Sequence, residues 1–147
     1  EILRCLVGSE MCIRDRVCNN AFRLAQALEK LEGVSVNYPL LESSPYHELA
    51  EKQLSGKGGA ILTIRAGSKE RAYKLINHLK YVKIATNIGD VRTLVIHPAS
   101  TIYIHSTPEA MAEAGVYDDT IRISVGIEDI KDLIQDFTEA VESLGEE

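Results

Sequence analysis

Hydrophobic positions along the chain repeat at two spacings, which predict helices alternating with strands. Apolar residues three or four positions apart mark helical segments, and apolar residues at every second position mark strands. The predicted helices cover residues 17–31, 44–56, 68–79, 107–114 and 130–144. The predicted strands cover residues 34–38, 58–65, 82–85, 93–97 and 121–125. This order predicts an α+β fold, in which a small and mostly antiparallel sheet has helices packed on one face.

Residues that favour caps and first turns stand at the ends of these segments. Gly33 follows the first helix, where a left-handed cap is expected, and Ser68 precedes the third helix as an N-cap. Pro45 stands in the first turn of the second helix, where proline is tolerated. Glu128 and Asp129 precede the last helix and suit its positive end. These signals agree with the boundaries drawn from the hydrophobic pattern.

Composition and charge exclude several classes of protein. The chain has 147 residues, enough for about one domain. Its net charge of -6 argues against nucleic acid or an anionic membrane as a partner. No stretch approaches the roughly 18 apolar residues that a transmembrane helix needs, and the first residues lack the features of a secretory signal. We therefore expect a cytoplasmic protein without a nucleic-acid or membrane partner.

The N-terminal segment has an unusual sequence. Residues 5–16 read CLVGSEMCIRDR and resemble the conceptual translation of a transposase sequencing adapter. The three cysteines, Cys5, Cys12 and Cys18, have a spacing that fits neither a zinc site nor a disulfide framework. We therefore expect residues 1–16 to be non-native. Because an adapter fused in frame implies that the gene continues upstream, we expect residues 17–147 to be the C-terminal part of a longer protein.

Period-two alternation predicts that the sheet has a polar face. In the last predicted strand, apolar residues alternate with Arg122 and Ser124. In the preceding strand, which follows a polar turn, Thr93 and His97 share one parity, and Leu94 and Ile96 share the other. A half-buried arginine can hold a carboxylate through two parallel hydrogen bonds, so Arg122 is a candidate anion-binding residue. The plainer interpretation is a solvent-facing arginine with no ligand.

Four stretches of the sequence carry a resemblance to a known family. Residues 87–101 read NIGDVRTLVIHPAST, and residues 121–129 read IRISVGIED. Earlier in the chain, residues 39–49 read PLLESSPYHEL, and residues 58–62 read GGAIL. In this order they resemble the C-terminal domain of the pyridoxal-phosphate-dependent enzymes of cysteine and methionine metabolism. The resemblance spans the chain from Val17 onward and implies the C-terminal domain of a fold-type I pyridoxal-phosphate enzyme.

The resemblance implies roles for individual residues. The arginine of the IRISVG strand, here Arg122, binds the α-carboxylate of the amino-acid substrate in this family. Thr93 is the second candidate for substrate binding, since it falls beside the same carboxylate where many relatives have serine. Asn87 and His97 lie in the same signature, although a hydrogen-bonded packing role is the favoured interpretation for His97.

The resemblance also implies pyridoxal phosphate as the cofactor, bound by a lysine as a Schiff base. The family's lysine lies in a Ser-x-Ser/Thr-Lys motif, which none of the lysines in this chain follows. Lys57 lies between two glycines but lacks the spacing of a phosphate-binding loop. The four histidines show no ligand spacing, so we expect no metal site. The catalytic lysine and the cofactor are expected in a large domain that the chain lacks, and the complete enzyme is expected to be a homotetramer.

The choice among reactions rests on few positions. The stretch around residues 87–97 most resembles the O-acetylhomoserine sulfhydrylases, which make homocysteine and acetate from O-acetylhomoserine and sulfide. Cystathionine synthases and lyases usually show Gly-Gly and Glu-Ser-Leu near this point. A cystathionine γ-synthase, cystathionine γ-lyase or methionine γ-lyase relative is the alternative within the family. From the residues alone, a stand-alone ligand-binding or regulatory module also remains open.

Overall fold

The computed structural model describes the backbone of residues 2–145 and the side chains of residues 12–145. Cys5 and the other side chains before Cys12 lie outside the described part. The helices are α1 (Ile2–Leu28), α2 (His47–Leu54), α3 (Lys69–His78), α4 (Pro108–Glu113) and α5 (Ile130–Glu142). The strands are β1 (Ser35–Asn37), β2 (Ile61–Arg65), β3 (Lys83–Ile84), β4 (Leu94–Ile96) and β5 (Thr120–Ser124). None of the helices within residues 2–145 is long and apolar enough to cross a membrane.

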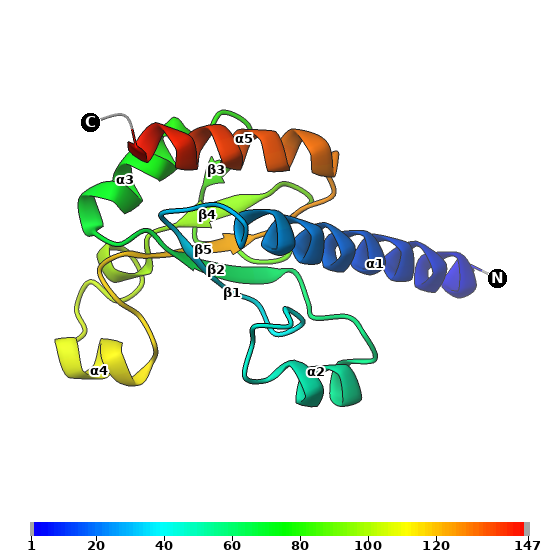
Figure 1. Cartoon of the computed structure of the whole chain (residues 1–147). Coiled ribbons are helices and arrows are strands. Elements are labelled where there is room, and N and C mark those ends of the chain that lie inside the picture. The colour runs from blue at the N-terminus through cyan, green and yellow to red at the C-terminus, as the bar shows by residue number, and fades with distance from the viewer. Residues whose placement is uncertain (1, 146–147) are drawn as a thin grey trace.

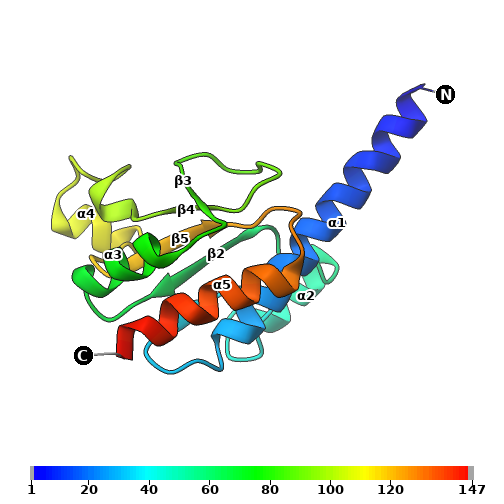
Figure 2. The same ribbon diagram turned by 90° about the horizontal axis from the view of Figure 1, so that it is seen from above.

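The strands form one five-stranded sheet in the order β1-β2-β5-β4-β3. The pairs β1–β2, β2–β5 and β5–β4 are antiparallel, and β3 runs parallel to β4. Helices α3 and α5 and the C-terminal half of α1 pack on one face, whereas the short α2 and α4 lie beyond the other face (Figures 1 and 2). The predicted α+β fold with a mostly antiparallel sheet is confirmed.

The hydrophobic core lies between the sheet and the three longest helices. The sheet contributes alternate residues that are fully buried, Leu62, Ile64, Val95, Ile121 and Ile123. The helices contribute one apolar stripe each, which includes Ala21, Leu24, Ala25 and Leu28 of α1 and Leu133, Phe137, Ala140 and Val141 of α5. Each large apolar side chain buried in this way stabilises the fold by roughly 1.5–3 kcal/mol. Along the described side chains of α1, burial begins at Cys18, and residues 12–16 are exposed.

The predicted cap of α3 is confirmed, and Asp129, which was expected to suit the positive end of the last helix, caps α5. The hydroxyl of Ser68 accepts a hydrogen bond from the backbone N–H of Arg71 at 3.2 Å. The carboxylate of Asp129 accepts one from the N–H of Lys131 at 2.8 Å. Gly33 has a φ of +90°, as its expected cap position requires, but it lies in the connection that follows α1 and not at the helix end.

Helix α2 and strand β2 begin later than predicted. The hydroxyl of Ser44 accepts a hydrogen bond from the N–H of Tyr46 at 3.2 Å, which forms a local turn before the helix. Pro45 therefore lies in this turn, and its predicted place in the first helical turn is wrong. Strand β2 starts at Ile61, because Gly59 has a φ of +85° that an extended strand does not adopt.

The segment between β3 and β4 runs back along the sheet instead of forming a simple turn. Because the two strands are parallel, the chain must return along their whole length before β4 begins. We call residues 85–93 the β3–β4 connection. It lies on the face of the sheet opposite α3 and α5, where Arg122 contacts its backbone.

Candidate functional site

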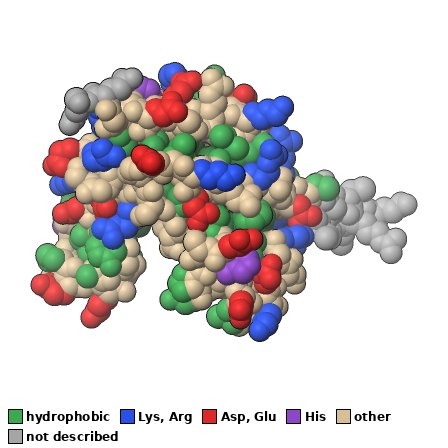
Figure 3. Space-filling view, in the orientation of Figure 1, with side chains coloured by type: hydrophobic (Ala, Val, Ile, Leu, Met, Phe, Trp, Pro, Cys, Tyr) green, Lys and Arg blue, Asp and Glu red, His purple; other side chains and the backbone are tan. Residues whose placement is uncertain are grey.

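The polar face that the alternation predicts is present on three of the five strands. The register places Asn37 of β1, Thr63 of β2 and Arg122 of β5 directly beside one another, and side chains opposite each other on paired strands share a face. Figure 3 shows a hollow in the surface below the sheet, between the part that carries α4 and the part that carries α2. The polar face of the sheet is directed toward this hollow.

The polar face does not extend over β4, and this part of the prediction is wrong. The register pairs Ile96 with Arg122 and Leu94 with Ser124, so two buried apolar side chains of β4 lie on the face of Arg122. Thr93 therefore projects toward the opposite, helix-covered side. The parity within each strand was predicted correctly, but the alignment of one strand with the next depends on contacts distant in sequence.

Arg122 reaches from the centre of β5 to the β3–β4 connection. Its Nη2 donates a hydrogen bond to the carbonyl oxygen of Thr86 at 2.7 Å and a longer one to that of Asn87 at 3.5 Å. The residue is half-buried. Its Nε and Nη1 groups donate no hydrogen bond to the described residues. The connection therefore orients the guanidinium group and leaves N–H groups for an anionic ligand.

Thr93 is fully buried, and its polar groups bond within the chain. Its backbone N–H and its hydroxyl both donate to the carboxylate of Glu128, at 2.6 and 2.9 Å. The hydroxyl also accepts a hydrogen bond from the N–H of Gly126 at 3.0 Å, and the carbonyl oxygen accepts one from the N–H of Lys83 at 3.1 Å. In this structure Thr93 therefore fastens the end of the β3–β4 connection to the turn between β5 and α5.

Two residues of this region have contacts that the sequence analysis missed. Glu128 was expected only to favour the positive end of α5, but its carboxylate binds Thr93, 35 positions away. The hydroxyl of Ser124 accepts a hydrogen bond from the N–H of Gly89 at 3.2 Å and so holds the middle of the connection. No periodicity or local motif links residues so distant in sequence. A local sign exists only for Glu128, because Asp129 caps α5 and leaves the carboxylate of Glu128 for another contact.

His97 is a buried residue of the packed core. The N–H of Ser100 donates to its Nδ1 at 3.2 Å, and its Nε2 lies 2.6 Å from the carbonyl oxygen of Asp118. The rings of Tyr73 and His97 pack in a T-shaped arrangement with their centres 4.9 Å apart. Both ring nitrogens are thus used within the chain, which agrees with the packing role favoured for this histidine.

The described residues do not fit a pyridoxal-phosphate site. A lysine that forms a Schiff base reacts as the neutral amine, so its pKa must be low. The carboxylate of Glu139 accepts a hydrogen bond from Lys80 at 2.6 Å and raises the pKa of this lysine. Lys57 forms an ion pair with Asp15 at 2.5 Å. Residues 12–145 also contain no cluster of three His, Cys, Asp or Glu side chains placed to hold a metal ion.

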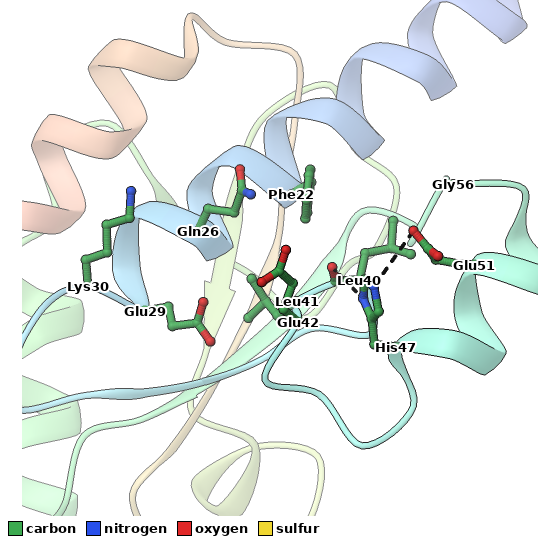
Figure 4. A pocket seen from close by; sticks show the side chains of 10 residues that line it. All are labelled: Phe22, Gln26, Glu29, Lys30, Leu40, Leu41, Glu42, His47, Glu51 and Gly56. Carbon is green, nitrogen blue, oxygen red and sulfur yellow. Dashed lines mark hydrogen bonds and ion pairs between the residues drawn. The ribbon is translucent and has the colours of Figure 1, made fainter.

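A groove of about 470 Å³ lies between α1 and the segment around α2, and Figure 4 shows the side chains that line it. Glu29, Glu42 and Glu51 line this groove against Lys30 and His47. An excess of carboxylates repels the carboxylate of an amino acid, so the groove does not suit that substrate class. Its floor is apolar and includes Phe22, Leu40 and Leu41.

A smaller cavity of about 170 Å³ lies on the polar face itself. Its wall includes Arg65, which donates to the carboxylate of Asp119 at 2.8 Å and stacks over the ring of Tyr117 at 4.2 Å. This volume is below the roughly 300–1,000 Å³ of ligand pockets. Arg122 lines neither this cavity nor the groove, so these two hollows do not form an enclosed pocket around its guanidinium group.

Comparison with known proteins identifies relatives along almost the whole chain. The model of the family "Cys/Met metabolism PLP-dependent enzyme" matches residues 11–142. Homocysteine synthase from Schizosaccharomyces pombe is 45% identical over 130 residues, which cover 87% of this chain and 30% of that protein. L-methionine gamma-lyase from Treponema denticola is 39% identical over 131 residues, which cover 88% of this chain and 33% of that protein.

A solved structure shows the same fold. The crystal structure named as an O-acetylhomoserine (thiol)-lyase from Campylobacter jejuni contains a pyridoxyl-lysine monophosphate. It matches this chain with a TM-score of 0.86 and 33% sequence identity, over 90% of this chain and 32% of that one. The matched part is the C-terminal part of the solved enzyme.

The chain thus spans about a third of the length of these relatives. The family match begins at residue 11, within the segment that we expect to be non-native. The match includes Arg122, Thr93 and the turn between β5 and α5, so the resemblance found in the sequence is confirmed at the level of the family. The chain belongs to the family of pyridoxal-phosphate-dependent enzymes of cysteine and methionine metabolism.

Proposed function

We propose that this chain is the C-terminal part of an O-acetylhomoserine sulfhydrylase, which makes homocysteine and acetate from O-acetylhomoserine and sulfide. Residues 17–147 then bind the substrate, and a large domain that precedes them holds the cofactor. The names of two relatives, a homocysteine synthase and an O-acetylhomoserine (thiol)-lyase, support this substrate and this product. Pyridoxal phosphate, where bound, supplies an electron sink for bond breaking next to the amino group of the substrate.

The observation that carries the proposal is the placement of Arg122. Its guanidinium group is half-buried on the polar face and is oriented by the carbonyl oxygen of Thr86 at 2.7 Å. A guanidinium group fixed in this way loses little conformational freedom when it binds a carboxylate. Thr93 is the second residue of the proposed site, and it acts by fixing the connection that orients Arg122.

A chimeric enzyme tests the role of Arg122. Residues 17–147 are fused behind the part of the S. pombe homocysteine synthase that precedes its matched segment, and turnover of O-acetylhomoserine with sulfide is measured. Arg122→Gln removes two charge-assisted hydrogen bonds and should lower kcat/KM by about 100-fold or more. The matched control is Arg92→Gln, an exposed arginine of the same connection, which should leave turnover unchanged. Equal losses in both variants would refute the proposed role.

The same chimera distinguishes the reactions of the family. The relative named L-methionine gamma-lyase supports elimination from methionine as the second candidate reaction. Assays with O-acetylhomoserine plus sulfide, with O-acetylhomoserine plus cysteine, and with methionine alone compare the kcat/KM values directly. The proposal requires the sulfide reaction to be the fastest, and a faster elimination from methionine would assign the chain to the γ-lyases.

A separate experiment tests whether the preceding domain, and not this chain, holds the cofactor. Under the proposal the purified chain alone binds no cofactor. Treatment with pyridoxal phosphate and borohydride should therefore not label one lysine in preference to the others. One stoichiometric adduct on one lysine would show that the chain holds its own cofactor site and would refute the division. The proposal also includes a homotetramer for the complete enzyme and a location in the cytoplasm.

A further inference from the structure

Asn20 is a buried polar side chain at the point where α1 reaches the core. It is 4% exposed, whereas residues 12–16 of the same helix are exposed. Its amide donates two hydrogen bonds, to the carbonyl oxygen of Gly126 at 3.1 Å and to that of Glu128 at 3.0 Å. The partners are 106 and 108 positions further along the chain. A buried amide costs free energy unless its N–H groups are bonded, so Asn20 requires this turn of the backbone in this place.

The two hydrogen bonds fix α1 in a way that its apolar contacts do not. The apolar stripe that begins at Ala21 is buried against the sheet and α5. Apolar contacts are not directional, so a helix held by them alone can shift or rotate against its neighbours. Hydrogen bonds require a narrow range of distance and angle. The amide of Asn20 therefore sets the position of the turn between β5 and α5 relative to α1.

The β3–β4 connection holds the same turn from its other side. The hydroxyl of Thr93 accepts a hydrogen bond from the N–H of Gly126 at 3.0 Å and donates one to the carboxylate of Glu128 at 2.9 Å. Between them, the N–H of Ile127 donates to the carbonyl oxygen of Val91 at 2.9 Å. Three consecutive residues of the turn thus bond to the connection, and two of them also bond to α1.

The connection in turn orients Arg122. The carbonyl oxygen of Thr86 accepts a hydrogen bond from its Nη2 at 2.7 Å, and the N–H of Gly89 donates to the hydroxyl of Ser124 at 3.2 Å. A guanidinium group presents its N–H groups in one plane, so a shift of the acceptor at Thr86 changes the direction in which the remaining groups point.

We infer that Asn20 is a positioning residue for substrate binding, because through Gly126 and Glu128 it fixes the connection that orients Arg122. The inference rests on the proposed function, in which Arg122 binds the α-carboxylate of the substrate. Asn20 acts on the arginine through the backbone and contributes no group to the reaction. Its loss should therefore weaken binding of the carboxylate and leave the bond-breaking steps nearly unchanged.

Hydrogen exchange of the 147-residue chain tests the link without any reaction. Asn20→Asp replaces both donors by a carboxylate and should speed exchange at the N–H of Gly89, in the connection, by about tenfold or more. The N–H of Ala110 in α4, which also donates to a hydroxyl, should exchange at an unchanged rate. The matched control is Asn19→Asp, an exposed neighbour with the same change of charge, which should leave both rates unchanged. An unchanged rate at Gly89, or equal acceleration at both positions, would overturn the inference.

A second variant separates the lost donors from the added charge. Asn20→Leu removes both N–H donors, brings no charge and fits a buried position of similar size. It should speed exchange at Gly89 about as much as Asn20→Asp does. Faster exchange in the aspartate variant alone would show that the charge is the cause, and would refute the role of the two hydrogen bonds.

Kinetics of the chimeric enzyme separate positioning from general stability. Asn20→Leu should raise KM for O-acetylhomoserine about tenfold and change kcat by less than about threefold. A loss of folded enzyme would instead lower kcat and leave KM unchanged, and that result would overturn the inference. Faster exchange at Gly89 together with a chimera that turns over no O-acetylhomoserine would refute the proposed reaction and leave the link from Asn20 to the connection intact.

Discussion

The hydroxyl group of Thr93 offers the sharpest test of how the site is held. It donates to Glu128 and accepts from Gly126, and the residue is fully buried. Thr93→Val keeps the shape of the side chain and removes only this group. The backbone N–H of Gly126 then loses its acceptor, and one carboxylate oxygen of Glu128 loses a donor.

The cost follows from these two losses. A hydrogen bond to a charged group contributes about 1.5–3 kcal/mol, and a buried N–H without an acceptor costs about 1–3 kcal/mol. Because the turn can relax, we expect Thr93→Val to lower the free energy of unfolding by about 2–4 kcal/mol. Thr93→Ser keeps the hydroxyl and loses one methyl group, so it should cost only about 1 kcal/mol.

Urea unfolding of the 147-residue chain, followed by circular dichroism, measures both values. With a slope of about 2 kcal/mol per molar urea, Thr93→Val should lower the midpoint by about 1–2 M. Thr86→Val, an exposed threonine of the same connection, is the matched control and should leave the midpoint within about 0.25 M of the wild type. If Thr93→Val and Thr93→Ser destabilise the chain equally, the hydroxyl contributes nothing and the reasoning fails.

Three further predictions use the same urea assay. Gly126→Ala should lower the free energy of unfolding by about 1–3 kcal/mol, because a Cβ there would lie 2.6 Å from the carbonyl carbon of Arg92; an unchanged midpoint would contradict this close packing. Lys80 lowers the pKa of Glu139 below its ordinary value of 4.5, so this pair's contribution is present above pH 4.5 and is lost as the pH falls through the lowered pKa. Glu139→Gln should therefore lose less stability than the wild type as the pH falls below 5. The same fall in the urea midpoint for the variant and the wild type would refute the coupling. Deletion of residues 1–16 should leave the free energy of unfolding unchanged, since residues 12–16 are exposed and the ion pair of Asp15 with Lys57 is at the surface. A fall in this free energy of more than about 1 kcal/mol would show that the segment is part of the fold.

Local patterns predicted the helices and the parity within strands well. The stripe of α5 and the cap at Ser68 depend on residues within a few positions of each other, and the structure confirms both. The polar character of Arg122 and its neighbours on β5 also follows from period-two alternation alone. A pattern read over ten residues therefore predicts which side chains lie together on one element.

Relations between elements could not be predicted in the same way. The sequence predicted two strands joined by a polar turn at residues 82–97, but β3 and β4 pair in parallel and a longer connection joins them. The register between β4 and β5 then decides that Ile96, and not Thr93, lies beside Arg122. A shift of one residue would place Thr93 on the same face as Arg122, and no local signal in either strand sets the register.

The turn between β5 and α5 links in space the two sequence stretches that contain Thr93 and Arg122. Gly126 must lack a side chain because the backbone of the β3–β4 connection packs against it. Glu128 binds Thr93, and the amide of Asn20 on α1 donates to the carbonyl oxygens of both Gly126 and Glu128, at 3.1 and 3.0 Å. This turn therefore joins the helix that enters the domain to the connection that orients Arg122. We therefore expect a change at any of these contacts to reach Arg122 through the backbone of the β3–β4 connection.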